Sequence, residues 1–212
     1  MGAWTHLFRS TGKAWRLRWA DMASSILLSS ITLPGHRAPA AGFEAPFEML
    51  GACHERVERM LRLLSMLQQH LIDSGWDDSV ASAARDVMRY FDLAAPLHHE
   101  DEERHVFPSL LAGEDAVLRK VVQRLQQDHR DMATAWVAVR AALESVSKTP
   151  SVGWTSFSSN EQNALIGFAD LYERHLRDEN DLAYPAAAAA LAPDALQAMS
   201  ADMMLRRGLQ LG

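Results

Sequence analysis

The chain has 212 residues, of which 48% are hydrophobic and 23% charged, with one cysteine and a net charge of -6. This composition excludes a disordered, collagen-like or disulfide-rich chain and suits one globular domain with an extension. Because Cys53 has no partner for an intrachain disulfide, a reducing compartment is favoured and we expect a cytoplasmic protein. No apolar run reaches the roughly 18 to 20 residues that span a bilayer, so we expect no integral membrane segment.

Residues 1–40 differ from the rest of the chain in charge. They hold five basic residues and one acidic residue, whereas the remainder holds sixteen basic and twenty-six acidic residues. The acidic body argues against nucleic acid as a partner, because phosphate contacts need clustered Lys and Arg. We expect residues 1–43 to form an N-terminal extension and linker outside the main domain.

Three interpretations of this extension stay open. Aromatic residues near one helical stripe, with Arg9 and Lys13 on another side, are typical of a basic amphipathic helix that makes a peripheral membrane or protein contact: Trp4, Phe8, Trp15 and Trp19. The short, serine-broken apolar segment 25–30 gives a weak secretory signal. The third interpretation is a mobile, irregular leader or a start codon placed too far upstream.

The spacing of apolar residues predicts two helices in the first part of the domain. Helix formers dominate from Glu44 to Ile72, and His54 lies on the apolar face of this segment. A second helix is predicted from about Val80 to Leu111, with one stripe along its length: Val80, Ala84, Val87, Phe91, Ala94, His98, Glu102 and His105. We expect Pro96 to bend or break this helix just before His98.

Two more long helices and a short one follow. The third carries an unbroken seam of steps of three and four: Leu118, Val122, Leu125, His129, Met132, Trp136, Val139 and Leu143. The fourth has the same steps: Leu165, Phe168, Tyr172, His175, Glu179, Leu182 and Ala186. We therefore predict an all-α, up-down-up-down four-helix bundle over residues 44–190, and a short C-terminal helix and tail over residues 191–212, after Pro193.

Six metal-ligand-type residues fall on the inward stripes of these helices: His54, His98, Glu102, His129, His175 and Glu179. Each histidine alone is more often a core residue, and each His-x3-Glu pair alone can be a solvated pair worth a few tenths of a kcal/mol. Burying unpaired carboxylates in four seams would be costly, however, and bound cations remove that cost. Four imidazoles and two carboxylates suit two iron ions better than a zinc tetrahedron, which often uses cysteine.

The pattern resembles the hemerythrin-like family, also called the HHE cation-binding domain, over residues of about 44–190. The motif has an early histidine in the first helix, His-x3-Glu before Phe-Pro, a lone histidine in the third helix, and His-x3-Glu before Tyr-Pro. The resemblance implies a non-haem di-iron centre with two iron ions. Glu102 and Glu179 would be the carboxylates that bridge them. Its implied ligands are His54, His98, Glu102, His129, His175 and Glu179.

The chain departs from the oxygen-carrying members at one helix. They have a second histidine one turn from the third-helix ligand, but Leu125 and Ala133 stand at those positions here. The set is similar to bacterial relatives linked to nitric oxide, oxidative stress and iron-sulfur repair. We therefore expect a protein that binds or reacts with a small diatomic ligand or oxidant (oxygen, nitric oxide or peroxide), rather than a substrate-specific enzyme.

Two alternative functions remain. A ferritin-like di-iron oxidase would need a Glu-x-x-His pair on two helices, and Glu102 with His105 supplies one. A metal-free helical interaction module would need neither metal nor ligand set. His105 is also a candidate ligand or hydrogen-bond donor, and a register error of one residue would bring His99 and Glu103 to the site.

Overall fold

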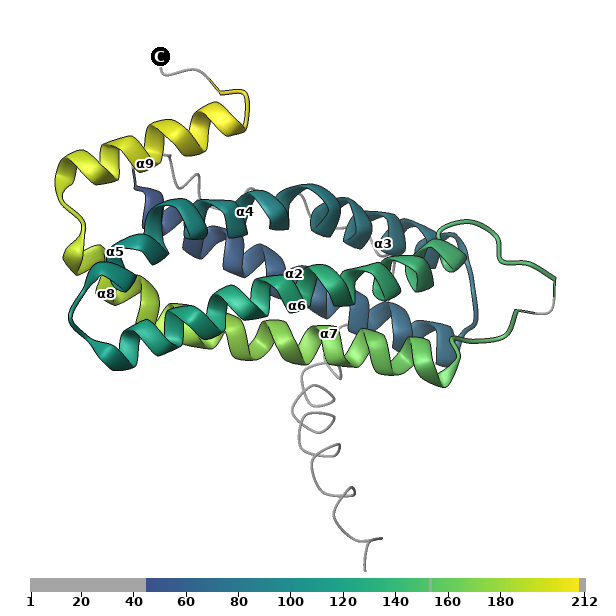
Figure 1. Cartoon of the computed structure of the whole chain (residues 1–212). Helices are drawn as coiled ribbons and strands as arrows, with labels where there is room; N and C mark the ends of the chain where they lie inside the picture. Colours follow the sequence, from purple (N-terminus) through teal and green to yellow (C-terminus); the bar gives the residue numbers. More distant parts are fainter. Residues whose placement is uncertain (1–44, 153, 210–212) are drawn as a thin grey trace, which may run out of the picture. The chain divides into compact units, whose positions relative to one another are not determined.

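The predicted all-helical fold is confirmed. The computed structural model describes residues 45–152 and 154–209, and every regular element in this part of the chain is a helix (Figure 1). The expectations for residues 1–43 lie outside the described residues. Within the described ranges, no helix has both the length and the apolar character needed to cross a membrane.

Four helical columns lie alongside one another in Figure 1. The first is α2 (Pro46–Asp73), and the third is α6 (Ala116–Val146). The second joins α3 (Asp78–Arg89), η1 (Tyr90–Ala94), α4 (Ala95–Asp101), η2 (Glu102–Val106) and α5 (Phe107–Ala112). The fourth joins α7 (Ser159–Asp178), η3 (Glu179–Ala183) and α8 (Tyr184–Ala190). The closing helix that was expected after Pro193 is present as α9 (Pro193–Arg206).

Short sequence signals set where the columns begin and end. The Asp77 carboxylate accepts hydrogen bonds from the backbone N–H groups of Ser79 at 2.9 Å and Val80 at 3.1 Å, and so caps α3. Ser158 forms a reciprocal capping box at the start of α7. After α2, Gly75 adopts a positive φ of 80°, a left-handed conformation that suits glycine at the end of a helix.

The prolines within the columns do not break them, because a π turn precedes each one. The N–H group of the residue just before Pro96, Pro108 and Pro185 donates to the carbonyl five residues back. In an α-helix the proline ring would clash with the carbonyl four residues back, and the wider turn, which adds one residue, relieves this clash. Of the bend or break expected at Pro96, the break does not occur: a π turn interrupts the regular α-helix before the proline, and the column continues through it.

At the end of each π turn, the buried position lies one residue later than the predicted stripe, whereas His98 and Glu102, between the ends of the first two turns, remain on it. In the second column, the predicted stripe ran through Ala94 and His105, but Ala95 and Val106 are the buried residues. The helical period of 3.6 cannot anticipate this shift, because the extra residue enters only where i to i+5 bonding replaces i to i+4 bonding. His105 therefore leaves the core face, which corrects its placement on the inward stripe.

The fourth and third columns, one with a π turn and one without, show the same relation between π turns and buried positions. In the fourth column, Ala183 and Ala187 are buried after the π turn in place of the predicted Leu182 and Ala186. The third column has no proline and no π turn, and most of its predicted seam is buried: Val122, Leu125, His129, Met132, Val139 and Leu143.

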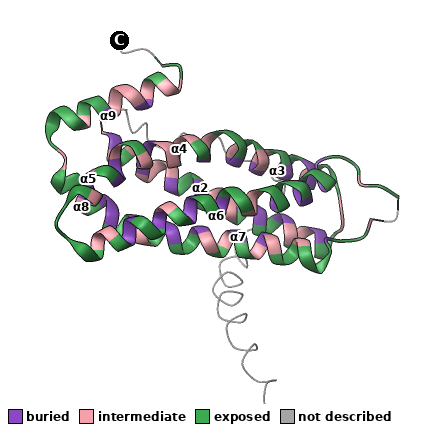
Figure 2. Ribbon diagram, in the orientation of Figure 1, coloured by how far each residue is buried: buried purple, intermediate pink, exposed green. Residues whose placement is uncertain are grey.

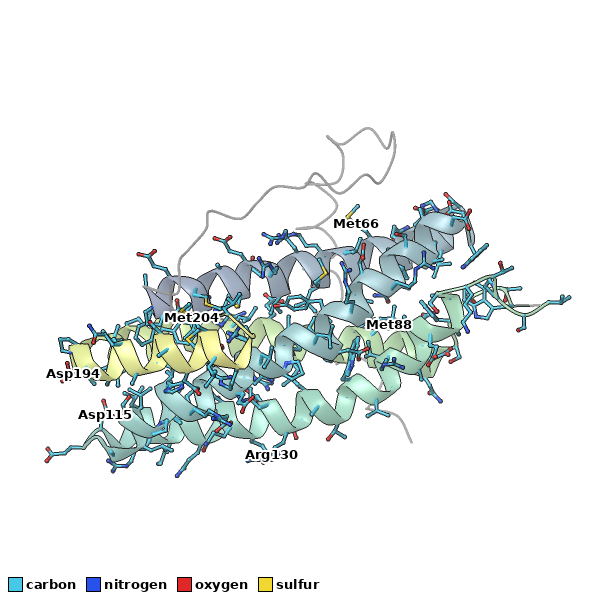
Figure 3. The ribbon with its side chains drawn as sticks, turned by 90° about the horizontal axis from the view of Figure 1, so that it is seen from above. Met66, Met88, Asp115, Arg130, Asp194 and Met204 are labelled. Atoms are coloured by element: carbon cyan, nitrogen blue, oxygen red, sulfur yellow. The ribbon has the colours of Figure 1, made fainter. Side chains whose placement is uncertain are left out.

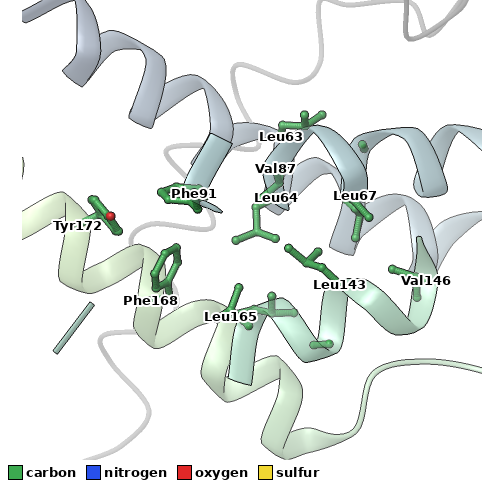
Figure 4. Close-up of a cluster of buried hydrophobic side chains, with 14 of the residues drawn as sticks. Leu63, Leu64, Leu67, Val87, Phe91, Leu143, Val146, Leu165, Phe168 and Tyr172 are labelled. Carbon is green, nitrogen blue, oxygen red and sulfur yellow. The ribbon is translucent and has the colours of Figure 1, made fainter. Parts of the chain in front are cut away.

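The buried side chains, drawn purple in Figure 2, gather on the inner faces of the columns in two apolar clusters. The larger cluster includes Leu64, Leu143, Leu165 and Phe168, which converge in Figure 4. The smaller cluster has these buried members: Leu50, Val106, Phe107, Leu110, Val121, Val122, Leu125, Ala183, Tyr184, Ala187, Met199 and Met203. On every column, residues of the two clusters lie on either side of the predicted ligand positions.

Helix α9 is attached to the bundle by buried methionines and by an ionic contact, and it lies along the bundle in Figure 3. Met199 and Met203 are fully buried in the smaller cluster. Asp101 of α4 is also fully buried, and its carboxylate accepts hydrogen bonds from Arg206 and, at 2.6 Å, from Arg207 Nη2. The closing helix is thus part of the folded core.

The cap of α3 gives a prediction about acid stability. Replacing Asp77 by Ala should cost about 1 kcal/mol of unfolding free energy near neutral pH. Hydrogen bonds, chiefly from the Ser79 hydroxyl, lower the pKa of Asp77 to about 2. Because this pKa is depressed, the stabilisation is complete above the ordinary Asp pKa of about 4 and is lost as the pH falls through about 2.

Urea unfolding of the wild type and Asp77→Ala across this pH range measures the effect. The difference between the two proteins should shrink toward zero as the pH approaches 2. Asp78→Ala, which alters the adjacent carboxylate, is the control. A cost of Asp77→Ala that stays constant with pH would contradict the assignment.

The ionic contact of α9 gives a second prediction. Asp101→Asn should destabilise the protein by about 2 to 4 kcal/mol, because two guanidinium groups lose their buried carboxylate. The loss should be concentrated in α9 and measured as faster amide hydrogen exchange there. Glu144→Gln, which removes an exposed carboxylate paired with Arg140 on α6, is the control, and equal exchange in both variants would refute a special role for Asp101.

Candidate metal centre

The six residues predicted as ligands form one polar layer inside the bundle. All are buried, with exposed fractions between 0% and 8%: His54, His98, Glu102, His129, His175 and Glu179. α2 contributes one of them, α6 another, and the second and fourth columns contribute a His-x3-Glu pair each. The two apolar clusters lie above and below this layer, so its carboxylates are held away from water.

The layer divides into two overlapping groups of potential cation ligands. The first half is formed by His54 and His98 with both carboxylates, and the second half by His129 and His175 with the same two carboxylates. Within each group the candidate ligand atoms lie within 4.8 Å of one another. Glu102 and Glu179 belong to both groups, which is the arrangement that two neighbouring cations sharing bridging carboxylates require.

In the first half, both imidazoles turn Nε2 toward the carboxylates. His54 Nε2 lies 3.2 Å from Glu179 Oε2 and 3.7 Å from Glu102 Oε1. His98 Nε2 lies 3.4 Å from Glu102 Oε1. The i,i+4 spacing of His98 and Glu102 places them on one helix face, as the sequence predicted.

The second half has the same orientation. His175 Nε2 lies 3.0 Å from Glu179 Oε1, and His129 Nε2 lies 3.4 Å from Glu102 Oε2. The two Nε2 atoms are 3.2 Å apart. Four imidazole nitrogens therefore face two carboxylates from four columns.

The π turns place both carboxylates. Glu102 is the first residue of η2 and Glu179 is the first residue of η3. In each case the backbone carbonyl of the glutamate accepts the i to i+5 hydrogen bond made by the aromatic residue before proline, Phe107 or Tyr184. The sequence Glu-x4-aromatic-Pro thus has a structural meaning, because the proline sets the turn on which the carboxylate lies.

Tyr184 is a residue of the site that the sequence pattern did not single out as polar. Its hydroxyl group donates a hydrogen bond to Glu102 Oε1 and lies 2.8 Å from His54 Nε2. Its ring stacks on that of His54, with centroids 4.9 Å apart. The Tyr-Pro motif belongs to the family pattern in the sequence, whereas the role of the hydroxyl depends on the packing of the fourth column beside the first.

The surroundings of each imidazole indicate how charge in the layer is balanced without a cation. Burial lowers the pKa of His98 to about 4. Burial also opposes charge on His54, but the adjacent carboxylates of Glu102 and Glu179 outweigh it and raise the pKa to about 10. At His175, burial is likewise outweighed by the charge of Glu179, and the pKa rises to about 9. Protonated imidazoles thus compensate the two buried carboxylates, and a bound cation would replace those protons.

Several buried polar atoms have no hydrogen-bond partner in the described part of the chain. They are both ring nitrogens of His98, Nδ1 of His175, Oε2 of Glu102, Oδ2 of Asp128 and both carboxylate oxygens of Glu179. Most buried polar atoms in proteins are paired, because an unpaired one costs about 1 to 3 kcal/mol. Those that face the shared centre of the layer, His98 Nε2, Glu102 Oε2 and the Glu179 oxygens, come from two columns and fit a cation site.

His99 and His105, the two other candidate histidines of this segment, lie outside the paired groups. His105 Nε2 contacts Asp202 of α9 at 2.7 Å. The His99 ring stacks on His129 with centroids 4.0 Å apart and an angle of 12° between the planes. His99 also forms a group of potential ligands with His129 and His175. An imidazole holds a metal in its ring plane, so two parallel, stacked rings cannot both ligate one ion.

The fold and the polar layer together define a helical protein with a candidate cation site. A family model described as the hemerythrin HHE cation binding domain matches residues 45–187. An uncharacterized protein of Haemophilus influenzae is 30% identical over 167 residues, which make up 79% of this chain and 92% of that relative. The chain belongs to the hemerythrin HHE cation-binding family, which confirms the resemblance inferred from its motifs.

The Tyr184 contact gives a prediction for the cation-free protein. Tyr184→Phe should lower the unfolding free energy by about 1.5 to 3 kcal/mol, because the charged Glu102 carboxylate loses the hydrogen bond that the Tyr184 hydroxyl donates to it. Tyr90→Phe is the matched control, since its hydroxyl donates to the backbone carbonyl of Cys53 at 3.2 Å. Urea unfolding of chelator-treated proteins measures both, and a smaller loss in Tyr184→Phe than in Tyr90→Phe would contradict the prediction.

Proposed function

We propose that this protein holds two iron ions in the polar layer and uses them to bind or react with oxygen, nitric oxide or peroxide. The proposed ligands are His54, His98, Glu102, His129, His175 and Glu179. The observation that carries the proposal is the pair of four-residue groups that share Glu102 and Glu179. Membership of a cation-binding family supports it.

The donor set supports iron as the metal. It contains imidazole nitrogens and carboxylate oxygens but no thiolate, and the one cysteine of the chain, Cys53, is absent from both groups. Such a mixed set suits iron, whereas structural zinc sites commonly use cysteine and have four ligands in a closed tetrahedron. Six protein ligands for two ions leave coordination positions for a small ligand.

The protein residues would bind the metals, exclude water and supply a proton donor. Iron supplies one-electron redox chemistry and affinity for diatomic ligands when it is bound. The two apolar clusters keep the layer dry, which strengthens its electrostatic interactions. The Tyr184 hydroxyl already donates a hydrogen bond to Glu102, one of the two shared carboxylates.

The third helix favours reaction with a small oxidant over reversible oxygen carriage. The positions one turn from His129 are Leu125, which is fully buried in the smaller apolar cluster, and Ala133. Neither offers a nitrogen, and the nearby His99 ring is stacked on His129. The second iron would therefore have an additional open position. We assign the protein to redox or nitrosative stress response or to iron handling.

The two alternatives have less support. The ferritin-like oxidase needed His105 beside Glu102, but His105 turns to Asp202 on α9. The metal-free interaction module leaves the unpaired atoms of His98 and Glu179 unexplained. Neither alternative has a specific observation in its favour.

Topology and compartment complete the proposal. We infer that the columns run up-down-up-down, because the connections of residues 74–77 and 113–115 suit antiparallel neighbours. An up-down-up-down arrangement brings the ligand-type residues of the four columns to one level of the bundle. The single cysteine supports a reducing compartment such as the cytoplasm.

Paired substitutions test the proposal. The double variant His98→Ala with Glu102→Ala should lose the bound iron, because it removes one ligand of the first half and a carboxylate shared by both halves. The control His105→Ala with Glu100→Ala changes the same residue types in the same segment outside the groups and should keep two iron ions per chain. Iron content after anaerobic loading, and the visible spectrum before and after addition of nitric oxide or oxygen, are the measurements.

The outcomes separate the candidate functions. Wild-type protein should bind two irons per chain and change its absorption with at least one of the small ligands. Wild-type iron content retained in the His98 and Glu102 double variant would refute the assigned ligand set. Wild-type protein that takes up no iron would favour the metal-free module.

A further inference from the structure

The two halves of the polar layer differ in what lies behind their imidazoles. All four rings turn Nε2 toward the shared carboxylates, so each has Nδ1 on the far side. The group that accepts a hydrogen bond from this second nitrogen fixes the orientation of a ligating imidazole and raises its basicity. The partners of the four Nδ1 atoms therefore bear on the strength of each half as a cation site.

Carboxylates stand behind both imidazoles of the second half. His129 Nδ1 lies 3.0 Å from Glu103 Oε1, and Gln126 donates a 2.7 Å hydrogen bond to the other oxygen of that carboxylate. His175 Nδ1 faces Asp128 Oδ2 at 3.7 Å. That separation is longer than a hydrogen bond, but neither atom has another hydrogen-bond partner in the part of the chain that the structure describes.

The Asp128 carboxylate is held in place from its other side. Its Oδ1 accepts a 2.7 Å hydrogen bond from Arg174, one residue before His175. The Asp128 side chain is only 5% exposed, whereas that of Glu103 is 35% exposed. Water therefore screens Glu103 more than Asp128.

No carboxylate lies behind either imidazole of the first half. His54 Nδ1 is paired at 2.8 Å with the amide oxygen of Asn180, which is a neutral group on an exposed residue. His98 Nδ1 is buried and has no hydrogen-bond partner among the described residues. One half is thus supported by two negative charges and the other by one neutral amide.

We infer that the two cation positions are unequal, and that Glu103 and Asp128 act as positioning residues which make the second half the tighter one. Their charges raise the donor strength of His129 and His175 and add attraction for a cation. The ion of the first half is then the exchangeable one. This inference rests on the proposed function, because it assumes that two iron ions enter the polar layer.

Anaerobic titration with iron(II) in competition with a chelator, followed by Mössbauer spectroscopy of protein loaded with iron-57, tests the inference. The wild type should bind two ions in two distinguishable steps and show two iron environments. Glu103→Gln and Asp128→Asn keep the shape of each side chain but remove its charge. Each should weaken the tighter step by roughly ten- to a hundredfold, the usual effect of losing such a partner, and leave the weaker step unchanged.

Asn180→Ala is the matched control in the other half. It removes the partner of His54 and should weaken only the weaker step. The Mössbauer signature should follow the same division, with Glu103→Gln altering one iron environment and Asn180→Ala the other. A role in stability alone would not separate the two environments in this way. Because Asp128→Asn also disturbs the contact with Arg174, Glu103→Gln decides the test if the Asp128 variant folds poorly.

The results distinguish failure of this inference from failure of the proposed function. Two equal steps in the wild type, or a Glu103→Gln variant that shifts the weaker step or neither step, would overturn the inequality while leaving a two-iron protein. Wild-type protein that binds fewer than two irons would instead contradict the proposed function itself.

Discussion

Burial of two glutamates between two apolar clusters is the constraint on which this bundle depends. Glu102 and Glu179 are fully excluded from water, and an isolated ionised carboxylate in such surroundings costs several kcal/mol. Four imidazoles from four columns surround them, and the raised pKa values of His54 and His175 favour protonated rings that compensate the carboxylates. Every column must therefore be in place before the charge is balanced, which couples the polar layer to the fold.

The prolines are the local cause of this placement. Pro108 and Pro185 each force a π turn, and the turn begins at a glutamate of the polar layer. Without the added residue, the next turn of each column would direct His105 and Leu182 toward the core. With it, Val106 and Ala183 fill the apolar cluster beneath the carboxylates. Apolar packing and carboxylate position are therefore set by one backbone feature.

The ligand-type residues of the layer form two similar halves, but the groups that surround these halves differ. The motif His-x3-Glu occurs twice, yet charged groups lie behind the imidazoles of only one half. Asp101, next to Glu102, is buried as well, but it accepts hydrogen bonds from Arg206 and Arg207 at the C-terminal end of α9. Neighbouring acidic residues of one short segment thus serve different purposes, one at the site and one in attaching the closing helix.

The sequence by itself determined the helical class, the family and the seams of columns without proline, because a 3.6-residue period and the His-x3-Glu spacing are local properties. The third helix shows this, since most of its predicted seam from Val122 to Leu143 is buried. Only the tertiary structure decided that Ala95, Val106 and Ala183 face the core, because the π turn before each proline adds a residue that the 3.6-residue period does not anticipate. It alone decided that Tyr184 meets Glu102, that His99 stacks on His129 and that Glu103 and Asp128 support one half, because these contacts join residues from different columns.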